Sequence, residues 1–288
     1  MSAPSINSVR CPVCFRRCAL AEGQTGFCGA RTNRGGRIAA DSYGCITALA
    51  LDPIEKKPLA RFRPGSLILS VGSYGCNLTC PFCQNHDISR MDAATFRRLY
   101  EAGKARMMSP EEVASLAQSL IDRGNIGIAF TYNEPTLCPE FIEDTTALAH
   151  QAALATVLVT NGSAAPKTWQ RIMQHIDAAN IDLKAFRSEL YRHLGGSLST
   201  VQANIQTAAQ ESHIEVTTLI IPGFNDSIAD MRAEAAWLAS IDPGIPLHLS
   251  RFFPSYCMTD RSPTDVDLIY RLREAAGDYL SHVYTGNC

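Results

Sequence analysis

Short apolar runs alternate with longer amphipathic segments along most of the chain, beginning near Leu67. The run LILSVGSYGC predicts a buried strand that ends at a glycine and a cysteine. The segment SPEEVASLAQSLIDRG predicts a helix with a capping box, because Ser109 is followed three residues later by Glu112. Strand and helix patterns then alternate as far as HVYTGN, which is expected to form a last short strand.

This alternation predicts a parallel sheet whose strands are joined by crossover helices. Five more apolar runs are expected to be strands: IGIAFTYNEP, ATVLVTNG, AANIDLKAF, IEVTTLIIPG and PLHLSRFFP. These runs are apolar on both faces, as buried parallel strands are. The six or seven strand–helix units fit a complete or partial barrel, and a doubly wound sheet is the alternative.

We therefore predict an α/β fold in which residues 67–288 form a partial (β/α)6 barrel, similar to a TIM barrel. Residues 1–66 are expected to form an N-terminal cysteine-rich extension. The polar segment RMDAATFRRLYEAGKARM is interpreted as a surface excursion between the first strand and the first helix of the barrel.

Polar residues gather where the predicted strands end. They are Tyr74 to Cys76, Thr131 to Glu134, Thr160 to Gly162, Asp182 to Lys184, and His248 to Arg251. In parallel β/α folds the chemistry collects at the carboxyl ends of the strands. We expect these groups to converge on the cysteine-containing loop that follows the first strand.

Composition narrows the class of protein further. Apolar residues make up 46% of the chain, and the net charge is −2, which does not favour nucleic acid or an anionic membrane as a partner. No stretch approaches the roughly 20 apolar residues of a membrane span, and the N-terminus MSAPSINSVRCPVC lacks the apolar core of a signal peptide. Of the eleven cysteines, seven fall in two tight groups, which favours metal binding over disulfides and predicts a reducing cytoplasm.

The first group is Cys76, Cys80 and Cys83, with the spacing C-x3-C-x2-C. Three thiolates in one strand-terminal loop fit three corners of a 4Fe–4S cluster whose fourth iron stays open. Zinc sites usually use paired C-x-x-C arms with four ligands. A structural zinc site and three unrelated buried cysteines remain the alternatives.

The segment CNLTCPFC resembles the signature of the radical S-adenosylmethionine (SAM) superfamily, with Phe82 as its aromatic residue. The resemblance implies that the amino and carboxylate groups of SAM chelate the fourth iron. It also implies that one electron, from a donor such as flavodoxin or ferredoxin, cleaves SAM to a 5′-deoxyadenosyl radical that abstracts hydrogen from a substrate. The cofactor carries this chemistry and the protein positions it, so no catalytic side chain is assigned.

The same resemblance implies roles for several strand-end residues. Glu134, with Asn133, matches the position of an acidic residue that binds the SAM amino group, and Thr160 and Asn161 would lie near the ribose. The alternatives are a helix-start carboxylate for Glu134 and a plain turn for the segment TNG.

Asp182 and Lys184 lie on one face of an apolar strand, so both need partners. Activating enzymes of glycyl-radical systems have a similar D-x-K in which the lysine contacts the SAM carboxylate, and a structural ion pair is the alternative. Some of those enzymes carry an aspartate before TN that helps to hold a monovalent cation, and this chain has Val159 there. His248 is expected to reach SAM or substrate, with a core histidine as the alternative.

Taken together, DPIEKKPL, RFRPGS, MSPEEV, TYNEP, NIDLKAF, IIPGFND and LSRFFP make the chain resemble the radical SAM enzyme of the AmmeMemoRadiSam system. That family is related to pyruvate formate-lyase activating enzymes. The resemblance implies Memo-like and AMMECR-type partner proteins. Activation of a glycyl-radical enzyme is the alternative function, and a non-catalytic metal-binding protein is the alternative of another class. The chain departs from the family at Phe253, where histidine is expected, and at Cys288, where a C-x-x-C is expected.

The second cysteine group is Cys11, Cys14, Cys18 and Cys28, hereafter the N-terminal quartet. Four closely spaced thiols allow a closed site for a second metal centre, either zinc or an auxiliary 4Fe–4S cluster. Structural cysteines without metal are the alternative.

Overall fold

The computed structural model describes residues 8–288 of the chain. The first seven residues of the predicted extension, including part of the N-terminal stretch tested for a signal core, lie outside the described residues. No helix of residues 8–288 is long and apolar enough to cross a membrane.

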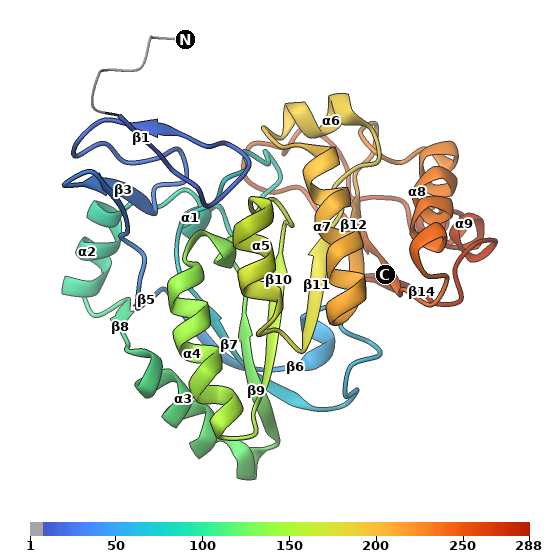
Figure 1. The fold of residues 1–288 in the computed structure, drawn as a ribbon. Coiled ribbons are helices and arrows are strands. Elements are labelled where there is room, and N and C mark those ends of the chain that lie inside the picture. The colour runs from blue at the N-terminus through green and yellow to red at the C-terminus, as the bar shows by residue number, and fades with distance from the viewer. Residues whose placement is uncertain (1–7) are drawn as a thin grey trace.

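One eight-stranded sheet forms the centre of the molecule, in the order β14-β13-β12-β11-β10-β9-β7-β6 (Figure 1). Its strands are β6 (Ala48–Pro53), β7 (Leu67–Gly72), β9 (Asn125–Phe130), β10 (Ala155–Thr160), β11 (Ala178–Asp182), β12 (His213–Ile220), β13 (Leu247–Arg251) and β14 (Val283–Gly286). All neighbours pair in parallel except β6, which runs antiparallel to β7 at one edge. The two edge strands, β14 and β6, do not pair with each other, so the barrel is partial.

Helices cover the outer face of this sheet (Figure 1). The crossover helices are α3 (Pro110–Ser119), α4 (Pro139–Gln151), α5 (Pro166–Met173), α7 (Leu198–Glu211), α8 (Ile228–Ile241) and α9 (Val266–Gly277), and shorter helices are α1 (His86–Ser89), α2 (Ala93–Glu101) and α6 (Ser188–His193). Each of the six crossover helices follows one parallel strand of the order β7, β9, β10, β11, β12 and β13. The predicted partial (β/α)6 barrel is therefore confirmed, with β14 as the expected last strand.

Local sequence signals explain where these elements begin and end. The Ser109 hydroxyl accepts from the Glu112 amide, the Glu112 side chain accepts from the Ser109 amide, and Pro110 occupies the first turn, so the predicted capping box of α3 is confirmed. The main apolar core lies between the sheet and its helices, where Trp169, Ile172 and Val201 are fully buried.

The inner face of the barrel is more polar, and the chain that follows β6 crosses its lower end. The Asn180 side-chain amide donates to the Pro58 carbonyl across 2.8 Å. The Glu215 carboxylate accepts from the Ala60 and Arg61 amides across 2.9 and 2.7 Å. These contacts from β11 and β12 hold residues 58–61 as a floor below the strand ends that carry the polar groups.

The segment of residues 90–107 differs from the prediction. It contains helix α2, whose N-cap Asp92 accepts from the Thr95 amide. The Phe96 ring stacks on Tyr74 at a centroid distance of 5.5 Å, and Phe96 is the one buried residue that anchors this otherwise polar helix. The single anchor explains why the sequence pattern of this helix was weak.

The predicted extension is built from short strands, namely β1 (Val9–Arg10), β2 (Ala19–Leu20), β3 (Arg31–Arg34), β4 (Arg37–Ala40) and β5 (Cys45–Ile46). Strands β1 and β2 form one hairpin, β3 and β4 form another, and β5 pairs with β8 (Arg106–Met107). In Figure 1 these blue segments lie beside α1, at the end of the sheet where the parallel strands finish. Strand β6 of the extension joins the main sheet, and the division into two domains at residue 66 stays a prediction.

Candidate functional site

The cysteine loop follows β7 directly and is fixed by its neighbours. Gly75 has a φ of +91°, and a Cβ at this position would lie 2.6 Å from the Cys28 carbonyl oxygen, so only glycine fits there. The Asn133 side chain accepts from the Ser73 amide across 3.0 Å and donates to the Tyr74 carbonyl across 3.0 Å. The structure therefore gives Asn133 a role in positioning the loop, in addition to its place in the cavity wall.

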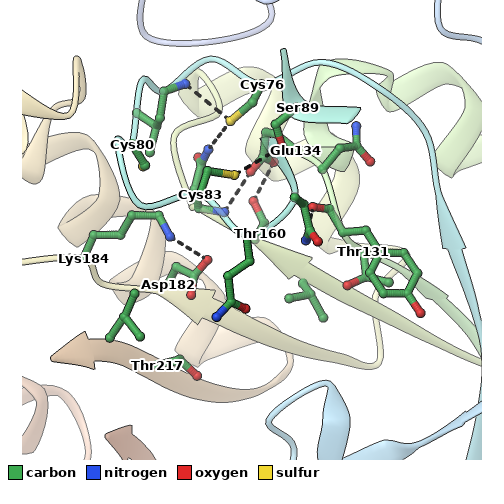
Figure 2. Close-up of a pocket in the computed structure, with 18 of the residues that line it drawn as sticks. Cys76, Cys80, Cys83, Ser89, Thr131, Glu134, Thr160, Asp182, Lys184 and Thr217 are labelled. Atoms are coloured by element: carbon green, nitrogen blue, oxygen red, sulfur yellow. Dashed lines mark hydrogen bonds and ion pairs between the residues drawn. The ribbon is translucent and has the colours of Figure 1, made fainter. Parts of the chain in front are cut away.

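The three thiols of the loop face one cavity (Figure 2). Burial raises the pKa of the Cys76 thiol to about 12, with the Glu134 carboxylate adding to the effect. Burial likewise raises the pKa of Cys80 to about 11, against the opposing charge of Lys184. Cys83 lies 3.7 Å from the Ser89 hydroxyl. Thiols this costly to ionise become thiolates when metal ions neutralise them, which fits a metal cluster.

Phe82 anchors the cysteine loop through apolar packing. Its ring is 4% exposed and packs in an apolar cluster with Leu78, Leu194, Ile221 and Phe252. Its ring meets that of Phe224 edge-on, with a centroid distance of 6.3 Å. Phe82 also lines the cavity, so it shapes the wall beside Cys80 and Cys83 and anchors the loop to the ends of β12 and β13.

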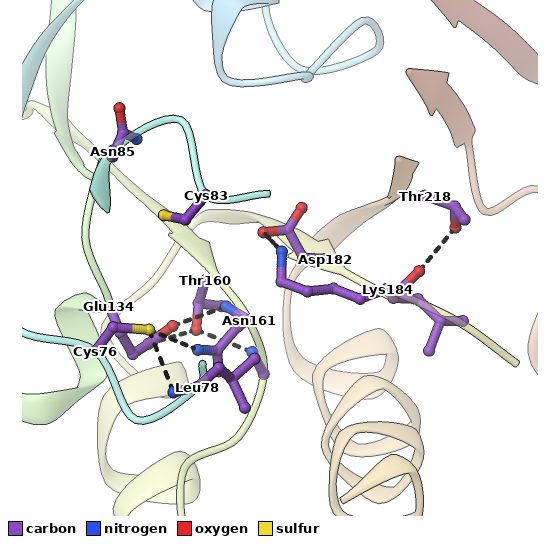
Figure 3. A network of polar contacts seen from close by, with 12 residues as sticks. Cys76, Leu78, Cys83, Asn85, Glu134, Thr160, Asn161, Asp182, Lys184 and Thr218 are labelled. Carbon is purple, nitrogen blue, oxygen red and sulfur yellow. Dashed lines mark hydrogen bonds and ion pairs between the residues drawn. The ribbon is translucent and has the colours of Figure 1, made fainter. Parts of the chain in front are cut away.

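Glu134 joins the ends of β9 and β10 (Figure 3). Its Oε1 accepts from the Thr136 hydroxyl at 2.6 Å and from the Thr160 hydroxyl at 2.7 Å, and its Oε2 accepts from the Asn161 amide at 2.8 Å. The side chain is 1% exposed, and burial raises its pKa despite these donors. Because Oε2 receives one donor among the described residues, it retains capacity to accept from a cationic ligand.

The predicted strand-end residues Thr160 and Asn161 are brought to the loop. The Asn161 side-chain amide lies 3.6 Å from the Cys76 sulfur and 2.9 Å from the Asn77 side-chain oxygen. Both residues also line the cavity. Their positions are thus determined by Glu134 on one side and by the cysteine loop on the other.

Asp182 and Lys184 lie on the opposite side of the cavity from Glu134 (Figure 3). The Lys184 ammonium donates to Asp182 across 2.9 Å. Burial works against the charge of Lys184, but the Asp182 carboxylate and the Cys80 thiol outweigh it, and the pKa of Lys184 lies above its ordinary value. An ammonium has three N–H donors, so Lys184 can bind a second anionic group while it keeps Asp182.

The cavity has a volume of about 310 Å³ and is lined by the cysteine loop and by residues at the ends of the neighbouring strands. Several lining residues were not predicted from the sequence, namely Lys56, Lys57, Gln84, Asn85, Ser89, Thr217, Leu219 and Asn287. The Thr217 hydroxyl is buried and has no hydrogen-bond partner among residues 8–288, which marks a place for a polar ligand group. A hydroxyl at an inward position of an apolar strand is the sequence signal that could have identified Thr217.

The structure gives His248 contacts outside the cavity wall, and its role in cofactor binding stays a prediction. Its Nε2 lies 2.6 Å from Glu215 Oε2, its ring stacks on Tyr284, and it is absent from the cavity wall. Ser250, two residues further along β13, lines the cavity instead. Barrel strands are staggered, so residues at the ends of different strands do not reach the same height. His248 helps Glu215 to hold the floor.

The four thiols of the N-terminal quartet lie within electrostatic reach of one another. Burial raises the pKa of Cys28 to about 11, and Cys14, Cys11 and Cys18 add to the rise in that order. Cys11 and Cys14 are buried, with 7% and 6% of their surface exposed. The sequence prediction that these residues form one group agrees with this arrangement.

Comparison with known proteins identifies the family to which this chain belongs. Residues 70–235 match the radical SAM superfamily. The chain is 35% identical to an uncharacterized protein of Methanocaldococcus jannaschii over 289 aligned residues, which cover 98% of this chain and 82% of that protein. The chain therefore belongs to the radical SAM superfamily.

Two other similarities agree with this assignment. The chain is 24% identical to the pyruvate formate-lyase-activating enzyme of Clostridium pasteurianum over 204 residues, covering 69% of this chain and 80% of that one. The fold is similar to that of Streptococcus suis SuiB in a crystal structure with S-adenosylmethionine bound, with a TM-score of 0.57, 15% identity, and coverage of 75% of this chain and 48% of SuiB.

The protein is accordingly a radical SAM enzyme related to activating enzymes, and its cofactors are a 4Fe–4S cluster and SAM. The enzyme prediction is confirmed over the alternative of a non-catalytic metal-binding protein. The site fits these cofactors on three independent features, which are the three thiols of one loop that line the cavity, the charged groups on two sides of the cavity, and the Thr217 hydroxyl, which lacks a hydrogen-bond partner among the described residues.

Proposed function

We propose that Cys76, Cys80 and Cys83 ligate the cluster and that the methionine end of SAM lies between Lys184 and Glu134. The observation that carries the proposal is the placement of one ammonium and one carboxylate in the wall of the cavity that contains the three thiols. SAM offers each of them an opposite charge, and charge-assisted hydrogen bonds are the strong ones. Thr160 and Asn161 are proposed to contact the ribose, and the Thr217 hydroxyl supplies a further donor.

The bound cofactors supply a 5′-deoxyadenosyl radical when an electron donor, such as flavodoxin or ferredoxin, provides one electron. The chain's own residues hold the cluster at one end of the cavity and orient SAM toward the interior. Residues 58–61 close the lower end of the barrel, so the substrate is proposed to approach from the side between the unpaired edge strands β6 and β14. A reducing cytoplasm is the proposed setting.

The proposed reaction is abstraction of a hydrogen atom from a substrate that acts together with Memo-like and AMMECR-type proteins. The support for these partners is the set of sequence segments that resemble the AmmeMemoRadiSam enzyme. The second candidate is activation of a glycyl-radical enzyme, supported by similarity to a pyruvate formate-lyase-activating enzyme over most of the chain.

One experiment separates the two candidates. The reconstituted enzyme is incubated with SAM and a chemical reductant, either with Memo-like and AMMECR-type proteins or with a pyruvate formate-lyase-type protein. A rise in 5′-deoxyadenosine that depends on the first set of proteins, measured by mass spectrometry against the enzyme alone, supports the first candidate. A glycyl-radical doublet in the electron paramagnetic resonance (EPR) spectrum of the second protein supports the activating role. Formation of 5′-deoxyadenosine without either signal argues against both substrates.

A further inference from the structure

The four thiols of the N-terminal quartet lie near one another around the β1–β2 hairpin. Cys11 and Cys18 face each other in the β1–β2 hairpin, where the Cys11 amide donates to the Cys18 carbonyl across 2.9 Å. Cys14 lies in the turn between them, where its carbonyl accepts from the Arg17 amide. Cys28 lies beside this hairpin, because a Cβ built on Gly26 would be in van der Waals contact with both the Leu20 side chain (3.7 Å) and the Cys28 sulfur (3.9 Å). Leu20 packs in one apolar cluster with Cys11 and Cys18.

The spread of these thiols distinguishes between a single ion and a cluster. A tetrahedral zinc site with Zn–S bonds of about 2.3 Å needs sulfurs about 3.8 Å apart. Among residues 8–288, no three cysteine, histidine or acidic side chains converge closely enough to hold one metal ion. The loop thiols Cys76, Cys80 and Cys83 likewise do not converge on one point. A cubane cluster does not require such convergence, because each thiolate binds a different iron.

We propose that Cys11, Cys14, Cys18 and Cys28 bind a second 4Fe–4S cluster rather than zinc. The ligand set is complete with four thiolates, so this cluster has no open iron and does not bind SAM. The proposal concerns a different site from the one in the preceding subsection and stands independently of it.

The second site lies directly against the first. The Cys28 carbonyl oxygen fills the space where Gly75 lacks a side chain, one residue before Cys76. The Arg16 guanidinium, between Cys14 and Cys18 in sequence, donates to the Asn77 carbonyl at 2.6 Å and to the Gly195 carbonyl at 2.7 Å. Two segments of the quartet's own loop thus touch the residues on either side of Cys76.

The quartet is also tied to the end of β10. Cys14 forms an isolated bridge with Ala164, and the Ala165 amide donates to the Val13 carbonyl across 2.9 Å. This turn begins with Asn161, whose side chain contacts the Cys76 sulfur. The two thiol groups therefore share neighbours on two sides, and we expect their clusters to lie close enough to interact magnetically when both are reduced.

The test uses the full chain, reconstituted anaerobically, with metal and sulfide analysis followed by EPR. The wild type is expected to contain about eight irons and eight sulfides, from two four-iron clusters. The triple variant Cys76→Ala, Cys80→Ala, Cys83→Ala should retain about four irons, since the quartet is intact. The double variant Cys11→Ser, Cys18→Ser should also retain about four. The control variant Cys257→Ser, Cys288→Ser changes two exposed cysteines and should retain about eight.

EPR adds a readout that does not depend on activity. The fully reduced wild type should show broadening from two interacting clusters, and each iron-deficient variant should show one isolated cluster. If the double variant fails to fold, the triple variant still decides the matter, because any iron it contains must lie in the quartet. One zinc per chain or no metal in the triple variant overturns the proposal. A SAM-insensitive wild type with eight irons contradicts the proposed SAM site but leaves this inference standing.

Discussion

The hydroxyl of Thr160 donates to Oε1 of Glu134 across 2.7 Å, and this contact joins the ends of β9 and β10 beside the cysteine loop. The same carboxylate accepts from the Asn161 amide through its other oxygen. A single buried acid therefore fixes two residues proposed to lie near the ribose and is itself proposed to bind the amino group of SAM.

This arrangement predicts different results for two substitutions of Glu134. Glu134→Gln removes the charge but keeps an acceptor, so SAM affinity should fall by about 10- to 100-fold, or roughly 1.5–3 kcal/mol. Glu134→Ala should in addition lower the free energy of unfolding by about 2–4 kcal/mol, because several buried donors lose their partner. SAM titration and urea denaturation measure the two effects. Unchanged SAM affinity in the Gln variant would restrict Glu134 to a structural role.

The pH dependence of SAM binding provides a second check on Glu134. Burial raises the pKa of this carboxyl, so it takes up a proton at higher pH than an ordinary glutamate as the pH falls. A protonated Glu134 cannot attract the ammonium group of SAM. We therefore expect the affinity of the wild type to weaken as the pH is lowered toward that raised pKa, and Glu134→Gln to lack this component.

Lys184 is expected to bind SAM while it remains paired with Asp182. Lys184→Met should weaken SAM binding by about 10- to 100-fold, with the cluster still assembled. Asp182→Asn removes the competing carboxylate, so its SAM affinity should equal or exceed that of the wild type. Lys167 is exposed on α5, and Lys167→Met serves as the matched control. If both Lys184→Met and Asp182→Asn bind SAM as the wild type does, the pair is only structural.

His248 is expected to support the floor of the barrel. His248→Ala removes one partner of buried Glu215 and should lower the free energy of unfolding by about 1–3 kcal/mol, with SAM affinity unchanged. Urea denaturation and SAM titration of the same preparation measure both quantities. A variant of normal stability that has lost SAM affinity would support the sequence prediction for His248.

We expect the protein to lose stability at alkaline pH because the carboxyl group of Glu234 is buried. The Thr218 hydroxyl lies 3.0 Å from the Leu183 carbonyl oxygen and 2.5 Å from Glu234 Oε1, and one hydroxyl hydrogen cannot serve both acceptors. Burial raises the pKa of Glu234 to about 8, so the acid is protonated in the folded protein at neutral pH and donates to Thr218. The folded state holds this proton more tightly than the unfolded state, in which the pKa of a glutamate is about 4.3. The resulting stabilisation of the folded state is complete below about pH 4.3 and is lost as the pH rises toward 8.

Glu234→Gln imitates the protonated acid at every pH. Its free energy of unfolding should exceed that of the wild type by on the order of 2 kcal/mol at pH 8.5, and the difference should shrink toward pH 5. Glu274→Gln changes an exposed acid on the neighbouring helix α9 and controls for the loss of charge. Equal stability of Glu234→Gln and wild type across this range would contradict the assignment.

The parts of the fold that could be predicted follow from strong local signals. The capping box at Ser109 and the apolar runs of β9 to β13 determined the element order, and a parallel sheet then placed the polar strand ends at one edge. The C-x3-C-x2-C spacing located the cluster loop without any knowledge of the fold. Asp182 and Lys184 were located because charge inside an apolar strand requires a partner. Glu134 was located by its place at a polar strand end and by the resemblance to the superfamily.

The remainder depended on three-dimensional relationships that sequence spacing does not encode. Because the barrel strands are staggered, Ser250 lines the cavity wall whereas His248 contacts Glu215, which holds the floor. Lys56 and Lys57 reach the cavity only because β6 pairs with β7 and the following chain turns beneath the sheet. The contact between Cys28 and Gly75 joins residues far apart in sequence, so the closeness of the two thiol groups could not be foreseen.

The most direct test of the proposed site is electron–nuclear double resonance of the reduced enzyme with SAM labelled with ¹⁵N in its amino group or ¹⁷O in its carboxylate. The Cys11→Ser, Cys18→Ser variant is used, so that the loop cluster alone contributes. If Cys76, Cys80 and Cys83 leave one iron open for SAM, hyperfine coupling should appear for both labels. A loop cluster that assembles with about four irons but has the same spectrum with and without saturating labelled SAM would contradict the account.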